Sequence, residues 1–112
     1  MCIATPEYAG GMPGALKNAL DWLVGSGELY GKRIVVMSAA PSEQRGGNAR
    51  RWVREVVQMQ GAEVLDSFTV ALPPGASDPL VGAVAETALA RSLGALVVTD
   101  EAPLAQAAPH AK

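Results

Sequence analysis

Short apolar runs alternate along this chain with segments in which apolar residues recur at helical spacing. Residues 33–40, RIVVMSAA, contain a β-branched run that is apolar on both faces, as in a strand buried within a parallel sheet. Similar runs occupy residues 1–4 and 62–72, and the last is expected to kink near Asp66. Because each run precedes a helical pattern, we expect an α/β fold with a parallel sheet, right-handed crossovers and helices on both faces.

Each helical segment carries signals for its ends. The first runs from Pro13 to about Val24, with the proline in its first turn. The second is predicted to begin at an asparagine cap, Asn48, and to stop at Gly61. The third is predicted to start with Asp78 as its capping residue.

The C-terminal part of the chain is harder to assign. Gly94 is expected to interrupt or end the third helix, and residues 95–99, ALVVT, fit either a short strand or another helical turn. Residues 101–112 are rich in Ala and Pro, and we expect them to be disordered. We therefore predict one domain over residues 1–99 and a tail over residues 100–112.

Composition narrows the function classes. A hydrophobic share of 49% with 18% charged residues indicates a globular chain, and 4% aromatics leave the core to Ala, Val and Leu. Of the two tryptophans, Trp22 and Trp52, we expect one in the core and the other at an interface. The net charge of −2 indicates no excess of positive charge with which to bind a polyanion, so we expect no nucleic-acid partner.

The chain start and the metal-ligating residue types argue for an ordinary intracellular protein. Residues 1–4 lead directly into Thr5 and Pro6 without a secretory pattern, and no stretch approaches the roughly 18 apolar residues of a membrane span. One cysteine, Cys2, cannot form an internal disulfide, and His110 stands alone in the predicted tail. We expect a cytoplasmic protein with no membrane association and no metal site.

The loop after the first strand, residues 5–14, lies where parallel sheets bind ligands, at the carboxyl ends of the strands. Pro6 stiffens its turn, and Tyr8 offers a flat ring with a polar tip. The remaining feature is a set of glycines that let main-chain amides approach a planar ligand: Gly10, Gly11 and Gly14. The alternative is that these residues merely end a strand and begin a helix.

The loop after the second strand, residues 38–47, lies at the same edge. Its free amides near the start of the next helix, with Arg45 alongside, could meet a carbonyl group or an anion. The alternative is a solvated loop with an asparagine cap. Neither loop matches a phosphate-binding or dinucleotide-binding glycine fingerprint.

The stretch TPEYAGGMPGALKNALDW, residues 5–22, resembles the segment TPEYN-G-S-x-PG-x-LKNAIDW of the NAD(P)H-dependent FMN reductase family, which includes quinone, chromate and azo reductases. The resemblance continues through residues 31–73 and covers about residues 1–95. It implies a flavodoxin-like, three-layer αβα fold whose strand order is 2-1-3-4-5. This chain would supply strands 3, 4 and 5 and lack the first two strands and helices.

The resemblance also implies that both loops contact the ring of FMN. The implied residues are Pro6, Glu7, Tyr8, Ala9 and Gly10 in the first loop and Ser38, Ala39, Ala40 and Gly47 in the second. No catalytic acid or base is implied, because the protein supplies orientation and electrostatics to a hydride transfer carried by cofactors. Position 9 is Ala where the family usually has Asn, so backbone contacts are expected there and side-chain contacts are not.

The implied activity is that of a flavin-dependent oxidoreductase using FMN and NADPH or NADH, with a quinone, a flavin or a similar small molecule as electron acceptor. The family's phosphate-gripping loop has no counterpart here, so Met1 is expected to be an internal methionine of a longer reading frame and much of the FMN affinity to be lost. The first strand would be an exposed sheet edge, which predicts a homodimer or higher homo-oligomer. One alternative is a truncated, non-catalytic interaction module. Another is an electron-transfer flavodoxin, which is less favoured because the stretch at residues 5–22 resembles the reductases.

Overall fold

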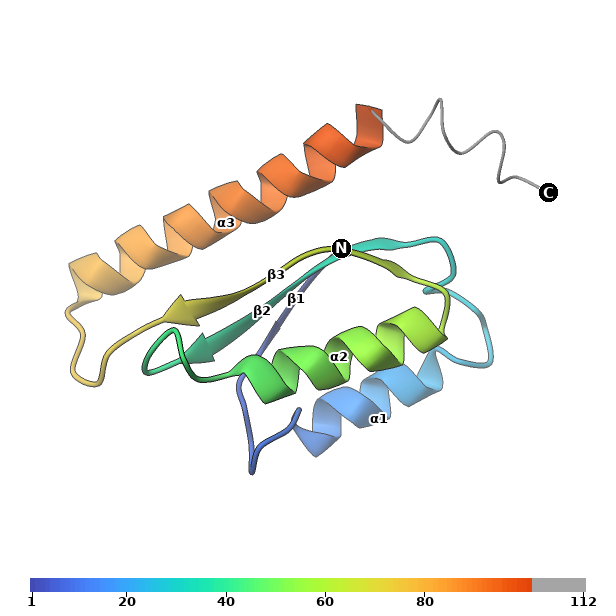
Figure 1. The fold of residues 1–112 in the computed structure, drawn as a ribbon, viewed down its shortest axis with the longest axis horizontal. Helices are drawn as coiled ribbons and strands as arrows, with labels where there is room; N and C mark the ends of the chain where they lie inside the picture. The colour runs from blue at the N-terminus through green and yellow to red at the C-terminus, as the bar shows by residue number, and fades with distance from the viewer. Residues whose placement is uncertain (102–112) are drawn as a thin grey trace.

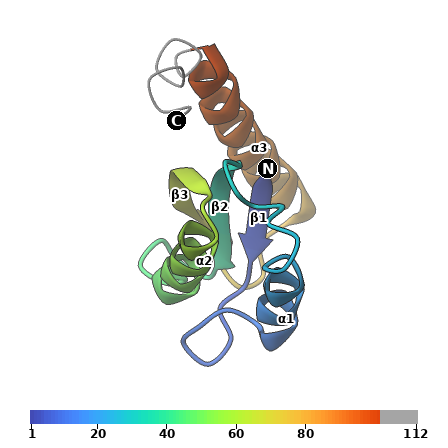
Figure 2. The same cartoon turned by 90° about the vertical axis from the view of Figure 1, so that its right-hand side faces the viewer.

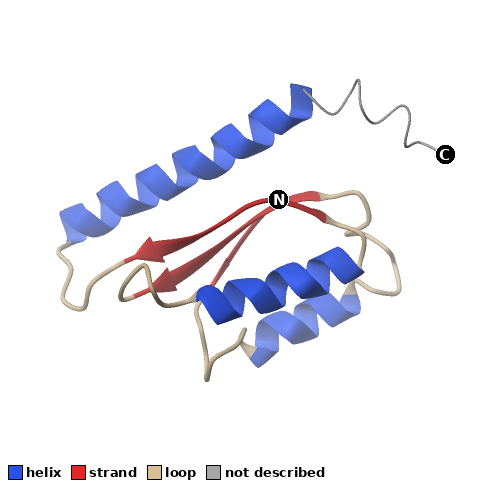
Figure 3. Cartoon of the chain, viewed as in Figure 1, coloured by secondary structure: helices blue, strands red, loops and turns tan. Residues whose placement is uncertain are grey.

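The computed structural model describes the backbone of residues 1–101 and the side chains of residues 1–97. Its strands are β1 (Cys2–Thr5), β2 (Arg33–Ala40) and β3 (Glu63–Ala71), and its helices are α1 (Gly14–Trp22), α2 (Gly47–Met59) and α3 (Asp78–Glu101). The strands form one parallel sheet in the order β1-β2-β3. Strands and helices alternate along the chain, as Figures 1 and 3 show, which confirms the predicted βαβ organisation.

The sheet is the middle of three layers. Helices α1 and α2 cover one face and α3 lies across the other (Figures 1 and 2). Side chains of the central strand alternate between the faces: Ile34 and Val36 belong to the core beneath α1 and α2, while Val35 packs with Phe68 and Ala88 on the α3 side. This αβα arrangement confirms the predicted fold class, a flavodoxin-like fold of which the chain supplies part.

The third strand contains an irregularity where the sequence predicts a kink. Ile34 pairs with Val64, but the next residue, Val35, pairs with Asp66, so Leu65 is an extra residue in β3. One unpaired extra residue is a β-bulge, which bends and twists the strand locally. The bulge confirms the predicted kink near Asp66.

Two helix starts differ from the prediction. Pro13 is the N-cap of α1 rather than part of its first turn, and the helix ends at Trp22. Helix α2 begins at Gly47 behind an N-cap glycine, Gly46, so the prediction of Asn48 as the capping residue was wrong. Asn48 is the second residue of the helix, past the N-cap position, so its side chain is not placed to cap the helix start. The predicted stop of α2 at Gly61 is confirmed, since the helix ends at Met59.

Helix α3 also departs from the prediction at both ends. The Leu80 amide donates to the Ser77 hydroxyl at 3.4 Å, so Ser77 rather than Asp78 supplies the capping side chain. Gly94 does not interrupt the helix, and residues 95–99 are its next turn, one of the two alternatives predicted. The helix continues because Ala95 and Leu96 pack against the core of the sheet, which offsets the roughly 1 kcal/mol that glycine costs in a helix. The rest of the predicted tail, residues 102–112, lies outside the described residues.

Helix α3 exposes most of its surface. Its residues Asp78–Val97 have a mean hydropathy of 1.5, so the stretch is long and apolar enough to cross a membrane by length and composition, and the prediction that no stretch approaches this was wrong. Length and composition alone do not assign a membrane, because the core helix of a soluble protein passes the same test. Its exposed large apolar side chains are Leu80, Val81, Leu89, Leu93 and Val97.

Neither tryptophan is buried. Trp22 is 79% exposed and Trp52 is 47% exposed, so the prediction that one of them lies in the core was wrong. The interior space is filled instead by aliphatic side chains, including Leu29 from the connection between α1 and β2. Trp52 has a different role, because it supports the loop that follows β1.

Candidate functional site

The two loops singled out in the sequence begin side by side. Thr5, the last residue of β1, is in register with Ser38 near the end of β2. Because the strands are parallel, the loops that follow all three strands lie at one end of the sheet (Figure 3). This is the edge where open parallel sheets bind ligands.

The first loop is built around a tight turn at residues 8–11. The Tyr8 amide donates to the Gly11 carbonyl at 2.9 Å, and the Gly11 amide donates to the Tyr8 carbonyl at 3.0 Å. The two central residues, Ala9 and Gly10, have φ values of 49° and 79°. Positive φ at both central positions defines a type I′ turn, for which Asn-Gly is the favoured pair. Ala9 therefore occupies a conformation that costs an L-residue about 1–2 kcal/mol.

Replacing Ala9 with asparagine should stabilise the protein. Asparagine tolerates the left-handed conformation, so Ala9→Asn is expected to raise the free energy of unfolding by about 0.5–1 kcal/mol, measured by urea denaturation. Ala19→Asn, at an exposed position in the interior of α1, is the matched control and should lower the free energy of unfolding by about half a kcal/mol through helix propensity. A loss of stability in Ala9→Asn would show that residue 9 is not strained in solution.

The turn presents its backbone and an aromatic ring outward. Tyr8 is 64% exposed, and Pro6, Ala9 and Gly10 are exposed beside it. Within the described residues, the amide groups of Ala9 and Gly10 have no hydrogen-bond acceptor. The turn thus offers two fixed donors and a flat apolar ring at the ligand-binding edge of the sheet.

Glu7 points in another direction, toward the start of α2. Its Oε1 accepts a hydrogen bond from the Ala49 amide in the first turn of α2 at 2.9 Å. A Cβ atom built on Gly11 would lie 3.1 Å from the ring of Trp52, one helical turn further along. The first loop therefore rests on α2, and Glu7 is half-buried in that contact.

Ser38 is fully buried in a polar network beneath the second loop. The Arg50 guanidinium donates to Ser38 Oγ and to Ser67 Oγ, both at 3.0 Å, and Thr69 Oγ1 lies 3.4 Å from Ser38 Oγ. Thr69 in turn donates to the Arg45 carbonyl at 3.1 Å. Burial lowers the pKa of Arg50, with Arg54 and Arg91 adding to the effect and Glu7 opposing it, yet arginine stays charged. The network holds the strand end and the loop together, and it uses the Ser38 hydroxyl.

The structure brings together only part of the predicted site. Pro6 through Gly10 and Gly47 lie on the side of the sheet covered by α2, with Gly47 exposed in the first turn of that helix. Ala40 is buried under the second loop. Ala39 is exposed on the opposite face, where it lines an apolar groove of about 260 Å³ between the sheet and α3.

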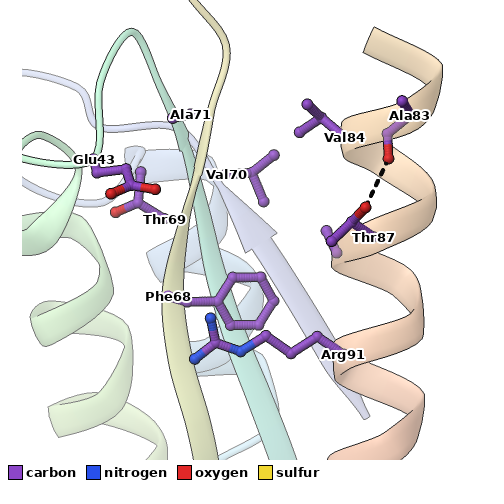
Figure 4. Close-up of a pocket in the computed structure, with 10 residues that line it drawn as sticks. Glu43, Phe68, Thr69, Val70, Ala71, Ala83, Val84, Thr87 and Arg91 are labelled. Atoms are coloured by element: carbon purple, nitrogen blue, oxygen red, sulfur yellow. Dashed lines mark hydrogen bonds between the residues drawn. The ribbon is translucent and has the colours of Figure 1, made fainter. Parts of the chain in front are cut away.

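A larger cavity, of about 360 Å³, lies elsewhere, between β3 and α3, and contains none of the predicted site residues. Figure 4 shows Arg91 lying across the ring of Phe68, with its guanidinium carbon 4.1 Å from the ring centroid. Arg91 also donates two hydrogen bonds to the Asp66 carboxylate, at 2.7 and 3.0 Å. These bonds hold the pKa of Asp66 below its usual range and raise that of Arg91. The sequence pattern did not reveal this cavity, because its lining residues come from β3, α3 and the loop after β2, which are far apart along the chain.

Arg50 is the other residue that the sequence analysis did not single out. It stands in the helix start GGNAR, residues 46–50, which the resemblance covers, so the signal was present in the sequence. What it contacts depends on the bulged pairing of β3, which the pattern alone does not determine. His110, which was expected to play no chemical role, lies outside the described residues.

The part of the chain that contains both loops matches a known protein family. The family model described as NADPH-dependent FMN reductase matches residues 1–77, which include every predicted site residue. Three curated proteins named quinone reductase, from Escherichia coli K12, Escherichia coli O157:H7 and Shigella flexneri, are each 30% identical to it over 86 residues. The match covers 73% of this chain and 46% of each relative, so the chain spans about half the length of the curated relatives it matches.

Proposed function

This chain belongs to the NADPH-dependent FMN reductase family, and from that membership we propose that it is a flavin-dependent oxidoreductase. The proposed cofactors are FMN and NADPH or NADH, and the proposed acceptor is a quinone, a flavin or a similar small molecule. The observation that carries the proposal is the outward type I′ turn at residues 8–11, whose two unpaired amides stand at the ligand-binding edge of a parallel sheet.

The residues present fit the ring of a flavin. When bound, FMN would supply two-electron chemistry, taking hydride from the nicotinamide and passing it to the acceptor. The chain contributes the amide donors of Ala9 and Gly10 toward the acceptor atoms of such a ring, and the ring of Tyr8 beside them. Glu7 and Arg50 hold the two loops in place. No described residue is assigned to the FMN phosphate, so the proposed contacts are with the ring alone.

A flavin titration tests this function directly. Flavin fluorescence should be quenched at micromolar protein, and NADPH oxidation should then depend on both FMN and a quinone. Tyr8→Ala should weaken flavin binding about twofold to tenfold, whereas Tyr30→Ala, which removes a ring that is 81% exposed in the connection between α1 and β2, should leave it unchanged. Colourless protein that neither quenches flavin nor oxidises NADPH would contradict the proposal.

Two exposed surfaces suit self-association, and a self-associating module without catalysis is therefore the second candidate. Within the described residues, β1 is an edge strand with no partner on its outer side, and α3 exposes a row of apolar side chains. Both surfaces favour association, so we propose a homodimer or higher homo-oligomer for either candidate. Light scattering should give a multiple of 11.5 kDa, and a mass of 11.5 kDa would exclude self-association.

The proposed location is the cytoplasm, where a free, exposed cysteine such as Cys2 remains reduced.

A further inference from the structure

Helix α2 starts without a capping side chain of its own. Its N-cap is Gly46, which forms no side-chain hydrogen bond, and its first turn contains no acidic residue. A helix start leaves amide donors unpaired and carries a partial positive charge. Such a start is stabilised when a carboxylate or hydroxyl oxygen from elsewhere accepts one of those amides.

Glu7 supplies that oxygen from 42 residues away in the sequence. Counting from Gly46, Ala49 is the third helical residue, whose amide is one of the two that capping side chains normally engage. The 2.9 Å hydrogen bond therefore has the geometry of a helix cap, but its carboxylate comes from the first loop and not from the residues next to the helix. A carboxylate at this position also neutralises the positive end of α2.

The turn that follows Glu7 gains its second support from the same helix. Gly11 closes the turn through its hydrogen bonds with Tyr8, and any side chain at Gly11 would meet the ring of Trp52. Ala49 and Trp52 lie three residues apart, so they share one face of α2. Two contacts, one polar and one by close packing, thus fix a turn that is otherwise exposed.

We propose that Glu7 is a positioning residue: by capping α2 it holds the turn at residues 8–11 so that the amides of Ala9 and Gly10 keep one orientation at the sheet edge. The inference rests on the proposed flavin site. Its structural part, the restraint of the turn, does not need a flavin and can be measured without one. Neither the family match nor the relatives' names assigns this role to Glu7.

The test compares Glu7→Ala with Glu7→Gln, and Glu55→Ala serves as the control because Glu55 is an exposed carboxylate later on the same helix. In protein without flavin, Glu7→Ala should speed hydrogen exchange at Ala49 about fivefold to tenfold and broaden the amide signals of residues 8–10. Glu7→Gln, which can still accept the hydrogen bond, should fall between Glu7→Ala and the wild type. Glu55→Ala should match the wild type.

Flavin binding by the wild type and the variants is measured with lumiflavin, which has the flavin ring without the phosphate. Glu7→Ala should weaken lumiflavin binding about fivefold to tenfold, with partial rescue in Glu7→Gln. If Glu7→Ala leaves both the turn signals and lumiflavin affinity unchanged, Glu7 is only a helix cap and the inference is wrong. If the wild type binds no lumiflavin but the turn still loosens in Glu7→Ala, the restraint stands and the proposed function fails.

Discussion

Replacing Gly46 with alanine is expected to lower the free energy of unfolding by about 2–5 kcal/mol. Gly46 has a φ of 86°, which costs an L-residue about 1–2 kcal/mol. A Cβ atom there would lie 2.5 Å from Ser38 Oγ. Ser38 is fully buried and hydrogen-bonded to Arg50, so it has little room to move, and forced contacts of this kind typically cost a further 1–3 kcal/mol, roughly. Urea denaturation measures the loss.

Gly75→Ala separates the two contributions to that loss. Gly75 has a φ of 77°, but a Cβ atom there would meet nothing within 4 Å. Its replacement should therefore cost only the conformational part, about 1–2 kcal/mol. Equal losses in the two variants would mean that Ser38 is not held where the structure places it, and the description of the polar network would be wrong.

The second large effect is expected from Leu29→Ala, at about 2–5 kcal/mol. Leu29 is 1% exposed and belongs to the core cluster that includes Leu20 and Ile34. Truncating a buried leucine removes apolar contacts and leaves a cavity that the surroundings fill only in part. A thermal or urea unfolding curve shows the change, which is a large fraction of the stability of a domain of this size.

Met59→Ala provides the comparison for Leu29. Met59 is also a large aliphatic residue, but it is 88% exposed at the end of α2, so its truncation should change the free energy of unfolding by less than about 0.5 kcal/mol. If Leu29→Ala were as mild as Met59→Ala, the connection between α1 and β2 would not be packed against the core in solution.

Most of the architecture could be predicted because it depends on local patterns. The β-branched run in β2 indicates a strand buried on both faces, and Ile34, Val35 and Val36 are each 0% exposed. Gly61 stops α2 because a residue with φ of 86° cannot continue the helix. These features require no knowledge of distant contacts.

The sequence predictions that failed share one physical cause. In each case the local structure depends on contacts with residues far away in the sequence. Asn48 has the right residue type for a cap, but Glu7 reaches the helix start from another loop. Gly94 lowers helix propensity, yet neighbouring residues of α3 pack on the sheet. Leu29 lies among turn-forming glycines and becomes core only because the connection folds back over α1 and β2.

The candidate site was predictable in its backbone and less so in its side chains. The turn at residues 8–11 follows from the resemblance and from the glycine at position 10. The side chains of Glu7 and Ser38 are used within the protein, in contacts that spacing along the chain does not reveal. Their predicted contacts with a flavin ring remain predictions that rest on main-chain groups.

We propose that the main-chain amides of Ala9 and Gly10, in the turn at residues 8–11, line a flavin ring. The most direct test is a titration of the ¹⁵N-labelled protein with lumiflavin, followed through its amide chemical shifts. The largest shifts are expected at Ala9 and Gly10, with Gly47 next. Shifts confined to the cavity between β3 and α3, around Phe68 and Thr87, would contradict it.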